Sequence, residues 1–190
     1  MTDREMSARL AEYQLQIAEL RNKMRKARAA AELEEVPDYV FTNSDGPVRL
    51  SDLFGEKADL IVIHNMGSSC PSCTLWADGF NGIYHHLASR AAFVVSSPDT
   101  PETQRSFAAG RGWRFPMVSH AGTSFAADMG YRSEEGGRLP GVSVFRRDRN
   151  RVLHVSDAQF GPGDDFCSLW HILDLLPGGP GDWQPKYRYG

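Results

Sequence analysis

The sequence contains little cysteine and no long apolar run. Its 190 residues include three cysteines, an odd number that is too small for the disulfide-stapled scaffold of a small secreted protein. The best apolar run, Leu60–Ile63, has the length of a strand, whereas a membrane-spanning helix needs about 20 apolar residues. The first six residues include three charged ones and lack the apolar segment of a secretory signal. We therefore expect a cytoplasmic protein with no membrane partner.

The chain also lacks an excess of charge of either sign. Its formal net charge is −3, and acidic and basic residues are distributed along the whole length. Proteins that bind nucleic acid usually carry a basic patch, so this balance gives no reason to expect nucleic acid as a partner. Apolar residues make up 41% and charged residues 24% of the chain, which is the composition of a folded domain rather than of a disordered segment.

Residues 1–36 are predicted to form a helical arm. Between Met6 and Glu35 there is no glycine or proline, and strong helix formers dominate. A helix of about 30 residues would be roughly 45 Å long, so we expect part of it to pair with a second copy in a homodimer; packing across its own domain is the alternative. Apolar or small residues recur at alternating spacings of four and three, as in a coiled-coil heptad: Met6, Leu10, Tyr13, Ile17, Leu20, Met24, Ala27 and Ala31.

Residues 37–176 are predicted to form one α/β domain, and residues 177–190 a tail too rich in proline and glycine for regular structure. The domain opens with a hairpin whose turn is Asn43–Gly46. Buried strands and helices then alternate until two strands form a second hairpin before the last helix. The main elements are strands at 60–64 and 92–96, helices at 70–90 and 101–110, strands at 142–145 and 152–155, and a helix at 166–176.

The order of these elements indicates the fold class. The strands at 60–64 and 92–96 need a parallel, right-handed crossover, whereas the last two strands pair antiparallel. A mixed sheet flanked by helices on both faces is the thioredoxin-like plan. We therefore predict an α/β fold of the thioredoxin-like class with an N-terminal helical arm and hairpin.

Two of the three cysteines form the motif Cys70-Pro71-Ser72-Cys73. Such a motif is a redox dithiol, half of a zinc site, or a structural remnant. Its position directly after a buried strand favours the dithiol, because open α/β folds place their sites at that edge of the sheet. Pro71 suits the first turn of a helix, which puts the Cys70 sulfur at the helix N-terminus, where backbone N–H groups stabilise a thiolate. Cys73 lies one turn further inside, as a resolving thiol should.

The motif and its surroundings resemble a known family. The chain is similar to the thioredoxin-like bacterial proteins of the domain-of-unknown-function 899 family, often labelled dithiol-disulfide oxidoreductases. The resemblance extends over nearly the whole chain, and it implies the thioredoxin-like fold. The segments that carry it are Asp38–Phe41, Val48–Phe54, Cys70–Gly82, Gly112–Pro116, Val118–Phe125 and Gly141–Asp148.

The label of this family implies a thiol–disulfide oxidoreductase without a cofactor or metal. In that reading Cys70 is the attacking thiolate and Cys73 resolves the mixed disulfide. Pro71, Ser72 and Trp76 are the expected substrate contacts; for Trp76, packing in the core is the alternative. The substrate is a protein or small-molecule disulfide, and the electrons come from another dithiol protein or from a low-molecular-weight thiol.

Two further site residues are assigned by similarity to thioredoxins in general. Pro140 precedes the third core strand, where that fold places a cis-proline packed against the dithiol. His64 stands six residues before Cys70, where thioredoxins bury a carboxylate. Since the unperturbed pKa of histidine is about 6.5, His64 is a candidate for taking the proton from Cys73; a core histidine with satisfied hydrogen bonds is the alternative.

Two other functions remain open. Peroxiredoxins share the fold, but their Pro-x-x-x-Thr-x-x-Cys signature is missing, since Gly67 stands at the threonine position. A non-enzymatic dimer that binds zinc or senses oxidation is the other possibility. Cys167 and His171, one helical turn apart, would then complete a zinc site with Cys70 and Cys73; packing as a small hydrophobic residue is the alternative for Cys167.

Overall fold

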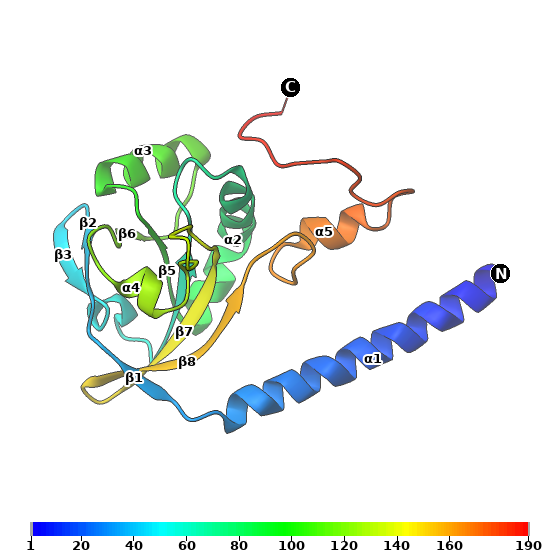
Figure 1. The fold of residues 1–190 in the computed structure, drawn as a ribbon, viewed down its shortest axis with the longest axis horizontal. Helices are drawn as coiled ribbons and strands as arrows, with labels where there is room; N and C mark the ends of the chain where they lie inside the picture. Colours follow the sequence, from blue (N-terminus) through cyan, green and yellow to red (C-terminus); the bar gives the residue numbers. More distant parts are fainter. Residues whose placement is uncertain (1, 190) are drawn as a thin grey trace. The chain divides into compact units, whose positions relative to one another are not determined.

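The structure is a computed structural model that describes residues 2–189. The chain divides into two compact units, Met1–Glu34 and Glu35–Gly190. The first unit is built on one helix, and the second holds the sheet and the remaining helices (Figure 1). Among residues 2–189, no helix combines the length and the apolar character needed to cross a membrane.

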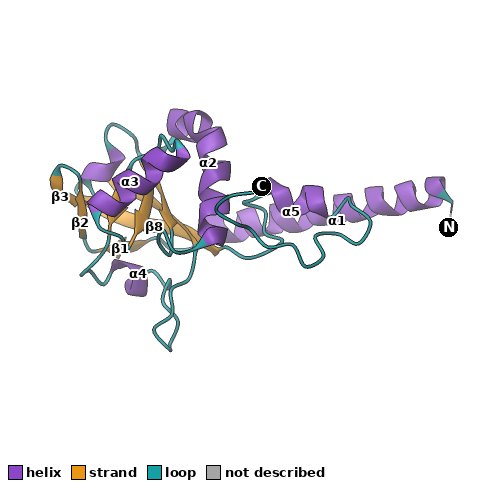
Figure 2. Ribbon diagram, turned by 90° about the horizontal axis from the view of Figure 1, so that it is seen from above, coloured by secondary structure: helices purple, strands orange, loops and turns teal. Residues whose placement is uncertain are grey.

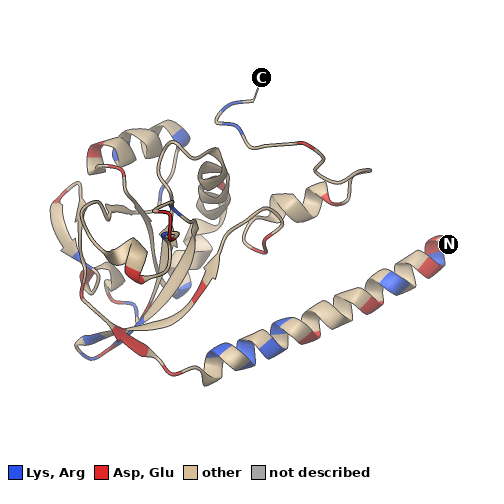
Figure 3. Cartoon of the chain, viewed as in Figure 1, with Lys and Arg blue, Asp and Glu red and all other residues tan. Residues whose placement is uncertain are grey.

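Helix α1 (Asp3–Ala30) forms most of the predicted arm. It begins with a capping box, in which the Thr2 hydroxyl accepts the Glu5 N–H and the Glu5 carboxylate accepts the Thr2 N–H. None of its side chains is buried, and its apolar positions are exposed. Basic residues gather on its second half (Figure 3). The prediction that the helix continues to Glu35 is wrong, because Pro37 restricts Val36 to extended backbone and residues Glu34–Val36 form a strand.

An eight-stranded mixed sheet forms the centre of the second unit, in the order β1-β8-β7-β4-β5-β6-β2-β3 among the described residues. The central strands β4, β5 and β6 are parallel, whereas β7 pairs antiparallel with β4 and β8 pairs antiparallel with β7. This mixed order confirms the thioredoxin-like class. The strands are β1 (Glu34–Val36), β2 (Val40–Asn43), β3 (Gly46–Arg49), β4 (Asp59–His64), β5 (Ala92–Ser97), β6 (Met117–Ser119), β7 (Gly141–Asp148) and β8 (Arg151–Gln159).

Helices cover both faces of the sheet (Figure 2). On one face lie α2 (Pro71–Arg90) and α3 (Pro101–Arg111), and on the other lie the short helices η1 (Asp52–Phe54) and α4 (Phe125–Asp128). Helix α5 (Ser168–Leu173) follows β8 and packs on the α2 face; it is shorter than predicted. Residues 177–189 form no helix or strand.

The side chains of β4 alternate between the two faces. Ile63 packs with Trp76 and Phe80 of α2, whereas Leu60 and Val62 belong to the opposite core, which contains Phe125 of α4. Because successive side chains of a strand point to opposite faces, His64 at the end of β4 belongs to the α4 side. The strand thus places the start of α2 and the side chain of His64 on different sides of the sheet.

Candidate active site

Cys70 lies at the N-cap of α2, at the sheet edge where β4 ends. Pro71 occupies the first turn of the helix, and the extended backbone of Cys70 lets its sulfur face the free N–H groups. The N–H of Cys73 donates a hydrogen bond to Cys70 Sγ over 3.1 Å. The Thr74 hydroxyl donates to the Cys70 carbonyl oxygen over 3.0 Å. These contacts hold Cys70, which is half-exposed, at the N-terminus of α2.

Electrostatics favour the thiolate of Cys70. The hydrogen bond from the Cys73 side chain, assisted by the N–H groups of Cys73 and Ser72, lowers the pKa of Cys70 to about 7 in spite of partial burial. A substantial fraction of Cys70 is therefore ionised at neutral pH, and the thiolate is the reactive form of cysteine.

Cys73 has the opposite character. Its side chain is 3% exposed, and its hydrogen bond to Cys70, together with burial, raises the pKa of its thiol. The N–H of Met66 donates to Cys73 Sγ over 3.4 Å. Cys73 therefore stays protonated beside the Cys70 thiolate, with one backbone donor already in place for its sulfur.

The loop between β4 and α2 is held by a carboxylate that sequence reasoning missed. Asp99, just beyond the end of β5, accepts the N–H of Ser68 over 2.7 Å. Gly67 has φ +109°, and a Cβ at this position would lie 3.1 Å from the Asp99 carboxylate, so a threonine here would strain the backbone and crowd the Asp99 side chain. The one signal in the sequence was that Asp99 follows the neighbouring parallel strand, whose end meets the same sheet edge.

The structure does not bring His64 to the dithiol. Its ring stacks on Tyr131, with centroids 3.7 Å apart, and on Phe125. Its Nε2 lies 2.9 Å from Ser143 Oγ, and burial, followed by the charges of two other histidines, lowers its pKa well below the ordinary value. His64 is therefore a neutral core histidine on the α4 face, which is the alternative that the sequence left open, and it lacks the basicity to take the proton from Cys73.

The buried histidines make stability depend on pH. Burial lowers the pKa of His120 to about 4. The unfolded chain takes up its proton near pH 6.5, so the free energy of unfolding should fall as the pH is lowered toward 4. For His120 alone we expect a loss of about 2 kcal/mol between pH 7 and pH 5, measured by urea unfolding. H120N should reduce this difference; equal stability of the wild type at both pH values would contradict the account.

Two other predicted site residues also need correction. No peptide bond within residues 2–189 is cis, so Pro140 is trans, the form that most X-Pro bonds prefer by about 0.5–1 kcal/mol. Trp76 is 4% exposed, packs on Phe160, and donates its Nε1–H to Asp164; it is a core residue rather than a substrate contact, because the helix turns it toward the sheet. Pro71 and Ser72 are half-buried beside Cys70, and their role as substrate contacts stays a prediction.

The residues of the zinc alternative are not gathered into a site. Cys167 is buried in the core at the start of α5, while His171 is exposed and lies 3.6 Å from Asp165. No group of three or more His, Cys, Asp or Glu side chains in the described part of the chain is arranged to hold a metal ion. Cys167 contacts the aromatic core instead, as a small hydrophobic residue does.

A family model described as "Bacterial protein of unknown function (DUF899)" matches residues 5–189. The chain belongs to this family. The resemblance found in the sequence is thereby confirmed, and the matched range includes α1 from Glu5 onward.

The DUF899 chain is also similar to peroxiredoxins. It is 30% identical to a chloroplastic peroxiredoxin Q of Sedum lineare over 143 residues, which cover 74% of this chain and 76% of the relative. The crystal structure of peroxidoxin BcpB from Mycobacterium tuberculosis superposes with a TM-score of 0.54 at 27% identity, covering 67% of this chain and 84% of that one. A peroxiredoxin Q structure of Xanthomonas campestris reaches 0.56 at 20% identity, over 68% and 86%, and shows the shared fold. These relatives support thiol-based redox chemistry.

Proposed function

We propose that this protein is a thiol–disulfide oxidoreductase that cycles between a Cys70, Cys73 dithiol and a Cys70–Cys73 disulfide. The observation that carries the proposal is the contrast between the two sulfurs. Cys70 is half-exposed with a pKa of about 7, whereas Cys73 is buried, protonated and hydrogen-bonded to it. This is the arrangement of an attacking and a resolving thiol.

The reaction follows from this asymmetry. The Cys70 thiolate attacks one sulfur of a substrate disulfide, and the other substrate sulfur leaves as a thiolate. Cys73 then loses its proton to solvent or to the departing thiolate and attacks Cys70 Sγ in the mixed disulfide, so that the second half of the substrate leaves. Two electrons pass from the dithiol to the substrate. A low-molecular-weight thiol or another dithiol protein reduces the Cys70–Cys73 disulfide again.

The backbone stabilises the Cys73 thiolate that forms in this step. As Cys73 ionises, the Met66 N–H already points at its sulfur, and a hydrogen bond from a backbone N–H to a charged acceptor favours the charged form. Arg138 donates to the Met66 carbonyl oxygen over 3.2 Å and so holds this residue in place. We infer a cytoplasmic setting, because three cysteines are too few for the disulfide-stapled scaffold of a small secreted protein.

Peroxide reduction is the second candidate, favoured by the similarity to peroxiredoxin Q. Here the Cys70 thiolate would attack one oxygen of the peroxide, be oxidised to a sulfenic acid and release water or an alcohol; Cys73 would then displace a second water and form the same disulfide. Against this reaction, Gly67 stands where the peroxiredoxin signature has a threonine. The loop that Gly67 forms lies against Asp99.

One experiment separates the two reactions. Pre-reduced protein is mixed with either hydroxyethyl disulfide or hydrogen peroxide, and formation of the Cys70–Cys73 disulfide is followed by mass spectrometry over time. We expect the disulfide to react the faster of the two at equal concentration. Faster reaction with peroxide would make the protein a peroxide reductase, and no oxidation of either cysteine by either reagent would refute both functions.

We further propose that α1 pairs with α1 of a second copy. Helix α1 has 28 residues and exposes seven large apolar side chains. Because most of the stability of a helix in a protein comes from packing of its apolar face, we do not expect α1 to be stable alone in water. Its apolar residues follow the heptad spacing that two identical helices can bury against each other.

Deletion of residues 1–30 tests this pairing. The full chain should be a dimer by light scattering, and the shortened chain should be a monomer that keeps the reactivity of Cys70, because that site lies wholly in the second unit. L10K places a charge at one of the heptad positions and should also give monomers. R9K changes a residue outside the heptad positions and should leave the dimer intact. A monomeric full chain would contradict the pairing.

A further inference from the structure

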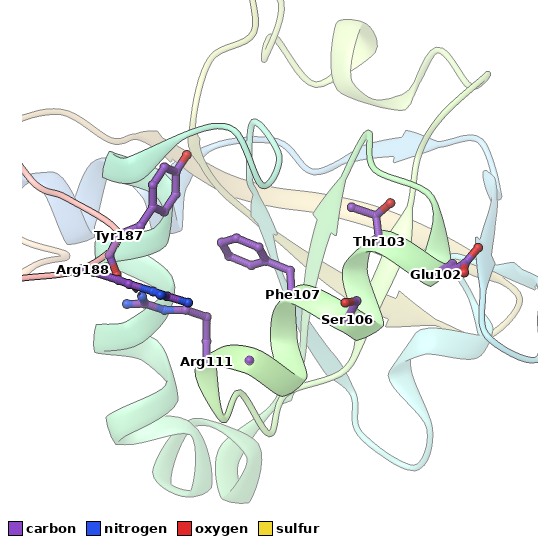
Figure 4. Close-up of a pocket in the computed structure, with 8 residues that line it drawn as sticks. Glu102, Thr103, Ser106, Phe107, Arg111, Tyr187 and Arg188 are labelled. Atoms are coloured by element: carbon purple, nitrogen blue, oxygen red, sulfur yellow. Dashed lines mark hydrogen bonds between the residues drawn. The ribbon is translucent and has the colours of Figure 1, made fainter.

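Arginine side chains line several cavities of the second unit, and they are engaged differently. In the cavity between α3 and the C-terminal tail (Figure 4), Arg111 pairs with Asp78 and donates to the carbonyl oxygen of Tyr187 over 2.7 Å. This arginine therefore joins α2, α3 and the tail. Another cavity, of about 350 Å³, lies beside the turn between β7 and β8. Small-molecule sites commonly have volumes of about 300–1,000 Å³, so this second cavity has room for a small metabolite.

Two guanidinium groups of the cavity beside the β7–β8 turn have no carboxylate partner. Arg147 and Arg149 both line it and are exposed, and neither forms an ion pair with a carboxylate of residues 2–189; Arg151, by contrast, is neutralised by carboxylates outside the lining. Neutral groups hold Arg147 instead: its Nη2 donates to the Ser51 carbonyl oxygen over 2.8 Å, and its guanidinium lies 5.0 Å from the centroid of the Phe54 ring. The position of Arg147 is therefore fixed while its charge is not neutralised.

Arg149 has a backbone conformation that favours glycine. Because Asp148 of β7 pairs with Arg151 of β8, Arg149 and Asn150 form a two-residue turn. Within residues 2–189, Arg149 is the one residue other than glycine with a positive φ, of 56°. Such a turn position usually carries glycine, asparagine or aspartate, because a larger side chain strains it. The chain thus places an arginine without an ion pair where glycine would relieve strain, and strained residues of this kind cluster at functional sites.

Two carboxylates complete the polar lining, and they are engaged to different degrees. Asp38 accepts both the N–H and the hydroxyl of Ser51 and pairs with Arg49 over 3.6 Å. Asp52 accepts one N–H, that of Arg49, over 3.2 Å. Since an ionised carboxylate has about four acceptor positions, Asp52 can accept further donors. The cavity therefore offers two positive charges and a carboxylate that can accept from a hydroxyl group.

This cavity and the dithiol lie at opposite edges of the sheet. β7 runs antiparallel to β4, with Arg146 opposite Asp59 at the start of β4 and Gly141 opposite His64 at its end. Cys70 follows the end of β4, whereas the β7–β8 turn lies beyond its start. A ligand in the cavity therefore does not contact the reacting sulfurs.

We propose that this cavity binds a small hydroxylated phosphate monoester, with the phosphate group on Arg147 and Arg149 and a hydroxyl group on Asp52. A phosphate monoester carries a charge of about −1.5 to −2 at pH 7, which matches the two guanidinium groups that no carboxylate neutralises. The planar guanidinium also binds phosphate oxygens through two parallel N–H donors. The site is separate from the proposed thiol chemistry and does not depend on it.

Calorimetric titration of the full chain with ribose 5-phosphate tests the proposal. R149G removes the guanidinium and also relieves the strained turn, so its midpoint of urea unfolding should equal or exceed that of the wild type. Ribose 5-phosphate should nevertheless bind about tenfold more weakly to R149G, the loss expected for one charge-assisted hydrogen bond. R149N is a second variant that should fold and show the same loss, because asparagine also tolerates a positive φ.

Controls separate this cavity from the one beside α3 and identify the group that is bound. R188G removes an exposed arginine that lines the cavity beside α3, and it should bind ribose 5-phosphate as the wild type does. Ribose should not bind, and inorganic phosphate should bind more weakly than the ester. Wild-type affinity of both R149G and R149N, loss of binding in R188G, or no binding to the wild type at millimolar concentration would show that the assignment is wrong. Equal binding of ribose or of inorganic phosphate would contradict the proposed class of ligand.

Discussion

Replacement of Cys70 by serine should abolish both disulfide exchange and the rapid alkylation of the protein by iodoacetamide at neutral pH. Cys70 is the cysteine whose pKa is lowered to about 7, and burial or hydrogen bonding raises the pKa of the other two. Since the thiolate is the nucleophile, no other sulfur can take its place. The expected loss is at least a hundredfold in the rate of alkylation, measured by mass spectrometry of the peptides.

The partner variants sharpen this test. C73S should leave Cys70 reactive and accumulate a mixed disulfide with the substrate, because nothing remains to resolve it. C167S is the matched control: Cys167 belongs to the core around α5, so this variant should keep full exchange activity. Alkylation of Cys73 before Cys70, or a disulfide that includes Cys167, would show that the assignment of nucleophile and resolving thiol is wrong.

Replacement of Gly141 by alanine should strongly destabilise the fold. A Cβ at this position of β7 would overlap the ring of Tyr131 and lie 2.5 Å from the backbone oxygen of Ala158 on β8. The backbone oxygen cannot move without opening the strand pair, so we expect a loss of about 3 kcal/mol in the free energy of unfolding, at the upper end of the range for overpacked cores.

Gly79→Ala is the natural control for this substitution. Gly79 is exposed within α2, and a Cβ there has no neighbour within 4 Å. Since glycine in a helix interior is about 1 kcal/mol less favourable than alanine, G79A should raise the free energy of unfolding by about that amount. Urea unfolding of both variants decides the matter, and equal stabilities of G141A and the wild type would contradict the close contact.

The parts of the fold that were predictable from the sequence are those with local signals. Pro71 and Pro101 mark the first turns of α2 and α3, and Gly112 ends α3 in a left-handed conformation. The strand β1 was missed because three residues at the end of a helical pattern carry no signal of their own; pairing with β8 and the proline at position 37 decide their conformation.

The candidate site was predictable where it depends on neighbours in the chain and not where it depends on neighbours in space. The Cys70 position follows from a strand, a proline and a helix in succession. The face of His64 did not follow, because β4 is a continuous apolar run without alternation, so nothing local tells one side of the sheet from the other. Asp99 reaches the loop before Cys70 from a segment whose sequence shows only a turn.

The central claim is that Cys70 is a thiolate at neutral pH while Cys73 is not. The pH dependence of iodoacetamide alkylation, with each modified peptide quantified by mass spectrometry, tests it directly. The account predicts that Cys70 is labelled with a half-maximal rate near pH 7 and that Cys73 stays unlabelled across the range. Labelling of Cys70 with a midpoint at the ordinary cysteine value of about 8.5, or labelling of Cys73 at a comparable rate, would contradict it.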